Sequence, residues 1–129
     1  MSEMANWLEN AVINYFLRNQ VITQPAAVYI ALHTADPGEN GTNGEVSGNA
    51  YGRAAVTMGA PTDGVSTNSG VVTFPTATPS GWGSIGWFSL WDAQSGGNCL
   101  MYSPVDAAKT INAGDTAQFG AGTITATMA

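Results

Sequence analysis

Apolar residues near the N-terminus recur at helical spacing. The spacing i, i+3, i+4, i+7 describes the positions of Met4, Trp7, Leu8, Ala11, Val12, Tyr15 and Phe16. Ser2 is suited to cap such a helix, and Glu3 is placed favourably at the positive end of its dipole. Ile13 and Leu17 widen the apolar surface beyond one stripe. We therefore expect an amphipathic helix that ends near residues 18–20, before Pro25.

After this segment the apolar spacing changes from helical to alternating, which is typical of half-buried strands. Alternating or apolar runs predict strands at Ala27–Thr34, Tyr51–Met58, Val71–Phe74, Ser84–Trp91, Asn98–Ser103, Thr116–Phe119 and Thr123–Met128. Turn-forming residues predict long loops at 35–50 and 59–70, and a linking segment at 104–115. Between residues 91 and 98, Asp92, Gly96 and Gly97 indicate a hairpin turn.

These elements predict a mainly β fold, a jelly-roll-like sandwich or barrel with one N-terminal amphipathic helix. We divide the chain into residues 1–20, a helical docking or assembly arm, and residues 21–129, a single β-domain. The length of 129 residues is sufficient for one core without disulfides or metals.

The charge of the chain limits its partners. Only 9% of residues are charged, and the formal net charge is −6. The basic residues Arg18, Arg53 and Lys109 are far apart in the sequence, so neither nucleic acid nor an anionic membrane surface is an expected partner. The first twenty residues lack the basic start and apolar core of a signal peptide. No apolar run approaches the roughly 18 residues that span a bilayer. We expect a soluble chain made in a cytoplasm and then assembled elsewhere.

Residues with catalytic or metal-binding potential are sparse. His33 is the only histidine and Cys99 the only cysteine, so no zinc-ligand spacing occurs. A Ser–His–Asp arrangement is assembled in space and stays open, but no nucleophile elbow is present. We favour a structural histidine, a buried cysteine, no enzymatic activity and no cofactor.

The loop after the first strand contains several potential oxygen ligands for calcium, namely Asp36, Glu39, Asn40, Asn43 and Glu45. Their spacing does not match an EF-hand. Asp, Asn and Gly also favour turns, so we favour a solvated loop and predict no metal site.

The aromatic residues near the hairpin allow three interpretations. Trp82, Trp87, Phe88 and Trp91 suit core packing, an intersubunit contact or a sugar-stacking surface, and we favour the core. The helix either docks on its own sheet or packs against a neighbouring subunit. The candidate assembly interface comprises Met4, Trp7, Leu8, Val12, Tyr15, Phe16 and Trp82.

The order of these segments resembles a family of small tailed-bacteriophage virion proteins. These proteins are often labelled tail fibre proteins, and some members are assigned as capsid decoration (cement) proteins. The resemblance is carried by LEN at 8–10, YIALHTADP at 29–37, SGNAYGRAAVT at 47–57, VTFPTAT at 72–78, WGSIGWFSLWDAQSGGNCL at 82–100 and DTAQFGAGTIT at 115–125.

The resemblance implies a jelly-roll-like β-domain, no enzymatic activity and oligomeric use in a phage particle. Our first expectation is a decoration protein that binds the major capsid protein on the outer capsid surface as a dimer or trimer. The alternative is a tail fibre or tail adaptor component that contacts other tail proteins or a host surface receptor. Either role makes the chain a virion component synthesised in the host cytoplasm.

Overall fold

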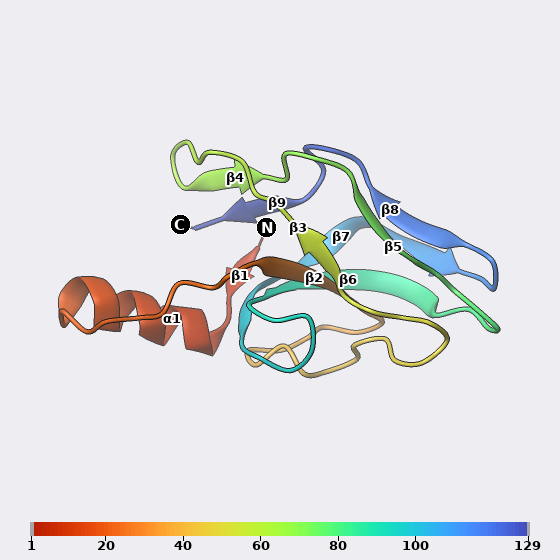
Figure 1. The fold of residues 1–129 in the computed structure, drawn as a ribbon, viewed down its shortest axis with the longest axis horizontal. Helices are drawn as coiled ribbons and strands as arrows, with labels where there is room; N and C mark the ends of the chain where they lie inside the picture. Colours follow the sequence, from red (N-terminus) through yellow and green to blue (C-terminus); the bar gives the residue numbers. More distant parts are fainter. Residues whose placement is uncertain (1, 129) are drawn as a thin grey trace.

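The computed structural model describes residues 2–128 as a two-layered β fold with one helical segment at its N-terminal end (Figure 1). The larger layer is a five-stranded sheet in the order β1-β7-β6-β2-β3, and every neighbouring pair is antiparallel. Its strands are β1 (Glu3–Met4), β2 (Val28–His33), β3 (Ala54–Val56), β6 (Gly83–Trp91) and β7 (Cys99–Ile111). The prediction of a mainly β fold is confirmed, and the form is a sandwich rather than a closed barrel.

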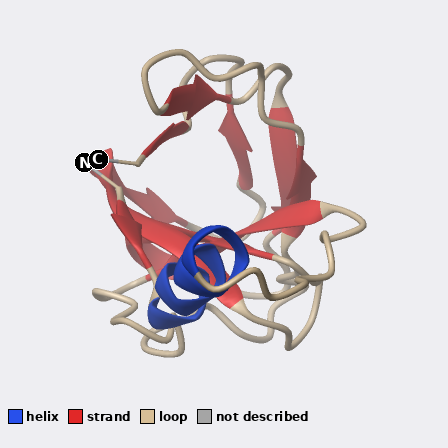
Figure 2. Ribbon diagram, turned by 90° about the vertical axis from the view of Figure 1, so that its left-hand side faces the viewer, coloured by secondary structure: helices blue, strands red, loops and turns tan. Residues whose placement is uncertain are grey.

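The second layer consists of two separate two-stranded ribbons. β4 (Val65–Thr67) pairs with β9 (Thr125–Thr127), and β5 (Val72–Thr76) pairs with β8 (Thr116–Phe119). Figure 2 looks along the sandwich and shows the strands surrounding an interior, with the helical segment at the near end. No strand of the two ribbons pairs with a strand of the five-stranded sheet within residues 2–128.

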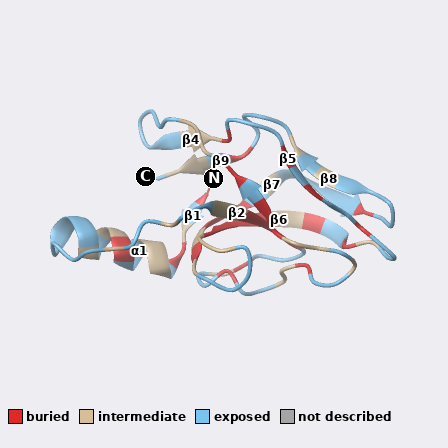
Figure 3. Ribbon diagram, viewed as in Figure 1, coloured by how far each residue is buried: buried red, intermediate tan, exposed pale blue. Residues whose placement is uncertain are grey.

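The main core fills the space between the layers. The sheet contributes Ile30 and Leu32 from β2, with Phe88 and Leu90 from β6, all at most 6% exposed. The ribbons contribute Val72 and Phe74. Figure 3 shows buried residues concentrated in β2 and β6, whereas most of the helical segment is exposed or half-buried. The alternation in the sequence therefore indicates the inner face of these strands correctly.

The opposite face of the sheet has a smaller core that includes Ala31, Trp91, Cys99 and Tyr102. The expected burial of Cys99 is confirmed, and burial raises the pKa of its thiol to about 12. The expected hairpin is also present, because Trp91 is paired with Cys99 across a turn.

Several element boundaries differ from those expected. Ser2 does not cap the helix: its hydroxyl donates to the Thr127 carbonyl, and the Thr127 amide donates to Ser2 Oγ. Met4 does not belong to the helix, although its spacing predicts that it does. It lies in β1 and is paired with Met101 of β7. β4 lies inside the expected loop at 59–70. The expected link at 104–115 is largely the second half of β7, which pairs with β6.

The sequence predicts a division into residues 1–20 and residues 21–129. Residues 1 and 129, at the outer ends of these two segments, lie outside the described residues. No helix within residues 2–128 has the length and hydrophobicity to cross a membrane.

Candidate assembly surface

The N-terminal helical segment projects beyond the end of the sandwich (Figure 1). It consists of α1 (Asn6–Val12) followed by a π-helical stretch, η1 (Ile13–Leu17). The predicted helix and its end near Arg18 are confirmed, but the first turn begins at Asn6. Ala11 is the only residue of α1 and η1 that is buried. The segment is thus attached at its base and largely uncovered towards its tip.

Backbone hydrogen bonds fix the base of this segment to the sheet. The Ala5 amide donates to the Leu100 carbonyl at 2.9 Å, and the Asn6 amide donates to the Glu39 carbonyl at 3.0 Å. Glu39 in turn accepts a hydrogen bond from the Tyr102 hydroxyl at 3.0 Å. Because these contacts surround the first helical residue, the direction in which the helix leaves the domain is defined by the fold.

An apolar groove of about 560 Å³ runs between the helical segment and the adjoining strands. We call it the helix groove. The helical side is lined by Trp7, Leu8, Ala11, Tyr15 and Phe16, and the opposite side includes Met58, Leu100, Met101, Ala126 and Met128. These residues come from both ends of the sequence, so the groove exists only in the folded chain. An apolar groove of this kind is suited to hold apolar side chains of another protein.

The tip of the helix carries large apolar side chains in solvent. Phe16 is 71% exposed, Leu17 is 76% exposed and Val21, in the following loop, is 94% exposed. Tyr15 and Phe16 contact each other edge to face, with ring centroids 4.9 Å apart. Isolated exposed apolar residues are common, but several of them near an apolar groove make this end of the molecule a candidate interaction surface. We refer to the helix groove and this tip together as the assembly surface.

The structure separates the residues of the candidate interface into three groups. Tyr15 and Phe16 are exposed, whereas Met4, Trp7, Leu8 and Val12 are half-buried along the base. Trp82 is 6% exposed and lies in the main core. We therefore remove Trp82 from the interface. Its indole is packed edge to face against Tyr51, and its Nε1 donates to the Asn49 carbonyl at 2.9 Å.

The structure adds residues that sequence reasoning did not assign to the interface. Ile13 and Leu17 already widened the apolar face in the sequence, so their exposure has a sequence signal. Val21 and Met128 have no such sequence signal. Val21 lies in a loop, and Met128 reaches the groove at the end of the β4–β9 ribbon.

The aromatic residues near the hairpin do not form a surface platform. Phe88 and Trp91 are at most 6% exposed and belong to the two different cores, and Trp87 is half-buried. Core packing therefore accounts for Trp82, Phe88 and Trp91.

His33 and Ser89 form a hydrogen-bonded pair that is fully enclosed. His33 Nε2 lies 2.7 Å from Ser89 Oγ, and both residues are 0% exposed. His33 Nδ1 lies 2.8 Å from the Asn43 carbonyl, which only accepts, so Nδ1 carries the proton and Nε2 accepts from Ser89. The Trp91 indole donates to the same hydroxyl at 2.6 Å. A nucleophilic serine needs access to substrate, so this arrangement serves the fold by joining the 35–50 loop to β2 and β6.

The carboxylates of the 35–50 loop are directed to separate partners. Asp36 accepts from the Gly38 amide, Glu39 from Tyr102, and Glu45 from Arg53 and Tyr51. Within residues 2–128, no group of three or more His, Cys, Asp or Glu side chains is arranged to hold a metal ion. The hydrogen bonds of Asp36, Glu39 and Glu45 serve turn formation and loop closure.

A small β-sandwich with an uncovered apolar helix is suited to assembly rather than to chemistry on a small substrate. Comparison with known families agrees with this class. The chain matches the family described as podophage GP4 fiber I protein gp80 over residues 3–127. Because this match spans nearly all of its length, the protein belongs to that phage fibre protein family. It is therefore a bacteriophage structural protein and a component of the virion. No curated protein matches the chain.

Proposed function

We propose that this chain is a non-enzymatic structural protein of the virion that attaches to its neighbours through the assembly surface. The observation that carries the proposal is the projecting helix, whose apolar tip is uncovered while its base is fixed to the sheet. Burying side chains such as Phe16 and Leu17 against another protein contributes roughly 1.5–3 kcal/mol each. A few such contacts give modest affinity per copy.

Repetition in the particle strengthens attachment. We propose that the chain acts as a dimer or trimer, because linked copies that engage together bind far more tightly than one copy alone. The apolar tip and the helix groove belong to the same chain and lie next to each other. Both subunit association and docking to another virion protein can therefore use this surface.

For the place of this protein on the particle, we favour the tail, in the role of a fibre or tail adaptor component. The name of the matched family supports it, since that name describes a fibre protein. In this role the partners are other tail proteins, or a host surface receptor.

Capsid decoration is the second candidate, with the major capsid protein as partner and the outer capsid surface as location. It is favoured by the sequence, which contains no heptad or other repeat from which an elongated stem could form. A net charge of −6 also suits an outward-facing position, away from packaged DNA.

Co-sedimentation distinguishes the two positions. Purified chain is mixed separately with phage heads that lack it, with tails that lack it, and with host cells. Saturable binding to tails or cells supports the fibre or adaptor role, whereas saturable binding to heads at a fixed ratio per shell subunit supports decoration. Binding to none of the three contradicts the proposed function.

A further inference from the structure

The fold leaves an open seam between β7 and β8. Among residues 2–128, β1 pairs with β7 only at Met101 and Tyr102, and beyond Ser103 β7 pairs only with β6, with a register shift between Pro104 and Lys109. In the described part of the chain, β8 pairs only with β5. Although β7 and β8 are consecutive in the sequence, they enter different layers. Within residues 2–128, no strand pairing joins their facing edges, so backbone donors and acceptors are left free there.

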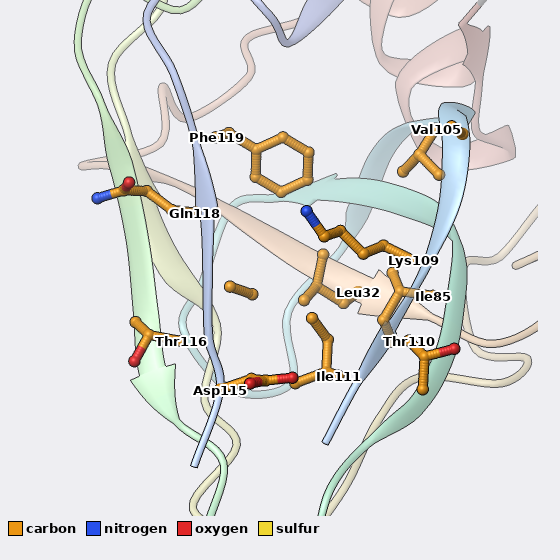
Figure 4. A pocket seen from close by; sticks show the side chains of 12 residues that line it. Leu32, Ile85, Val105, Lys109, Thr110, Ile111, Asp115, Thr116, Gln118 and Phe119 are labelled. Atoms are coloured by element: carbon orange, nitrogen blue, oxygen red, sulfur yellow. The ribbon is translucent and has the colours of Figure 1, made fainter. Parts of the chain in front are cut away.

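A cavity of about 540 Å³ occupies this seam (Figure 4). β7 and β8 run along its two sides, and the buried side chains of Leu32, Ile85 and Ile111 form its floor. Phe119 closes one end of the cavity. The seam therefore combines an apolar floor with strand edges on both walls.

One cation points into this cavity. From β7 the cavity is lined by Val105, Ala107, Lys109, Thr110 and Ile111, and the register between β6 and β7 shifts between Pro104 and Lys109. Figure 4 shows the Lys109 side chain directed across the cavity towards Phe119. Lys109 makes no hydrogen bond or ion pair with any residue in 2–128, whereas Arg18 binds Asn14 and Arg53 binds Glu45. Lys109 is an exposed residue, so its ammonium is open to a partner from outside the chain, and the one carboxylate that lines the same cavity, that of Asp115, accepts from the Asn112 amide.

We propose that the β7–β8 seam accepts an extended segment of another polypeptide, which adds as a strand to the free edge of β7 and places an acidic side chain opposite Lys109. Strand addition satisfies the free backbone groups, the apolar side chains of the segment fill the floor, and its carboxylate pairs with the ammonium. A small organic anion would satisfy only the ammonium. A peptide strand uses all three features of the seam.

Lys109 also selects against pairing between two copies of this edge. In such a pair two inward lysines would share one apolar space, and like charges on facing strands are destabilising. The partner segment is therefore a different sequence, with an acidic residue flanked by apolar residues at alternate positions. This inference goes beyond the proposed function, because the seam and the assembly surface are lined by different residues.

The test uses the full chain and a capped synthetic peptide with the sequence TVTETVT, whose two valines and central glutamate share one face. Two control peptides carry either lysine in place of glutamate or methyl groups on the amide nitrogens of alternate residues. Binding is followed through backbone amide NMR shifts at low ionic strength. Lys109→Glu reverses the charge in the seam, and Arg18→Glu makes the same charge change on the remote helix.

The proposal predicts shifts confined to residues 105–111 and 116–119. N-methylation should weaken binding about tenfold or more, because it removes backbone hydrogen bonds. The unmodified chain should prefer the glutamate peptide over the lysine peptide by about two- to fivefold. Lys109→Glu should reverse that preference and Arg18→Glu should not. Absence of shifts at the seam, equal binding of the N-methylated peptide, or an unchanged preference in Lys109→Glu would each overturn the proposal.

Discussion

The guanidinium of Arg53 lies over the Trp91 ring, with its central carbon 3.9 Å from the ring centroid. The same group donates to both carboxylate oxygens of Glu45 at 2.9 Å, and to the carbonyls of Ala93 and Gly96. Arg53 is 8% exposed. One side chain, just before β3, thus joins that strand to the 35–50 loop and to the hairpin turn.

Replacing Arg53 should destabilise the protein because several charged hydrogen bonds are lost together. We expect Arg53→Met to lower the free energy of unfolding by about 2–3 kcal/mol, with Glu45 left without its partner. Urea unfolding followed by tryptophan fluorescence measures the change. Arg18→Met, on the exposed helix end, is the matched control and should stay within about 0.5 kcal/mol of the parent. Equal stability of the two variants would contradict the role assigned to Arg53.

His33 should make stability depend on pH in a defined direction. Burial lowers its pKa below the ordinary value of 6.5, although the Asn43 carbonyl and Glu45 oppose this shift and Arg53 adds to it. Below about pH 6.5 the unfolded chain binds the proton more readily than the folded chain, so stability should fall as the pH decreases from that value. In His33→Gln this slope should flatten between pH 7 and pH 5. A variant with the parent's slope would show that other groups cause it.

Glu45 should add a second loss of stability at lower pH. Burial alone would raise its pKa, but the hydrogen bonds from Arg53 and Tyr51 hold it below the ordinary value of 4.5. Its contribution is complete above that value and is lost as the pH falls through the folded-state pKa. Glu45→Gln should therefore be less stable than the parent at pH 7, and the difference should shrink at pH 3. Unfolding curves at the two pH values measure it, and a constant difference would contradict the assignment.

Trp82 should behave as a core residue and not as an interface residue. Trp82→Ala should lower the free energy of unfolding by about 3–5 kcal/mol, because it opens a cavity beside Tyr51 and Phe74. Thermal unfolding measures the loss. An unchanged melting curve would contradict this prediction and would indicate that Trp82 lies on the surface.

Removing divalent cations should leave stability unchanged. The carboxylates of Asp36, Glu39 and Glu45 already accept hydrogen bonds from the protein, in different directions. We expect equal melting temperatures with and without EDTA. A fall on chelation that calcium reverses would show that the 35–50 loop holds an ion.

The sequence predicts the fold class and most strands because alternation reports which residues face a core. It does not reveal the second half of β7. Residues 104–110 contain proline, aspartate and lysine and resemble a loop, yet pairing with β6 at Pro104, Lys109 and Thr110 carries the strand through them, across a shift in register. Similarly, Met4 continues the helical pattern but pairs with Met101. In both segments a partner distant in the sequence determines the local structure, and local propensity does not report it.

The candidate interface shows the same limit. Helical spacing places Tyr15 and Phe16 on the apolar face, and the structure leaves both exposed; their role in an interface stays a prediction. Trp82 looks equally suitable in the sequence, but its burial depends on Tyr51 and Phe74 from two other segments. The seam beside Lys109 cannot be seen in the sequence at all, because it arises where two consecutive strands separate into different layers.

The central claim is that the exposed helix tip attaches this protein to the particle. The most direct measurement compares the parent, Phe16→Ser/Leu17→Ser and the control Asn10→Ser, an exposed polar position of the same helix outside the groove. Each variant is tested for unfolding stability and for co-sedimentation with phage particles that lack the protein. We predict stabilities within about 0.5 kcal/mol of one another, with particle binding lost only in the double variant. A double variant that folds and binds like the parent would contradict the account.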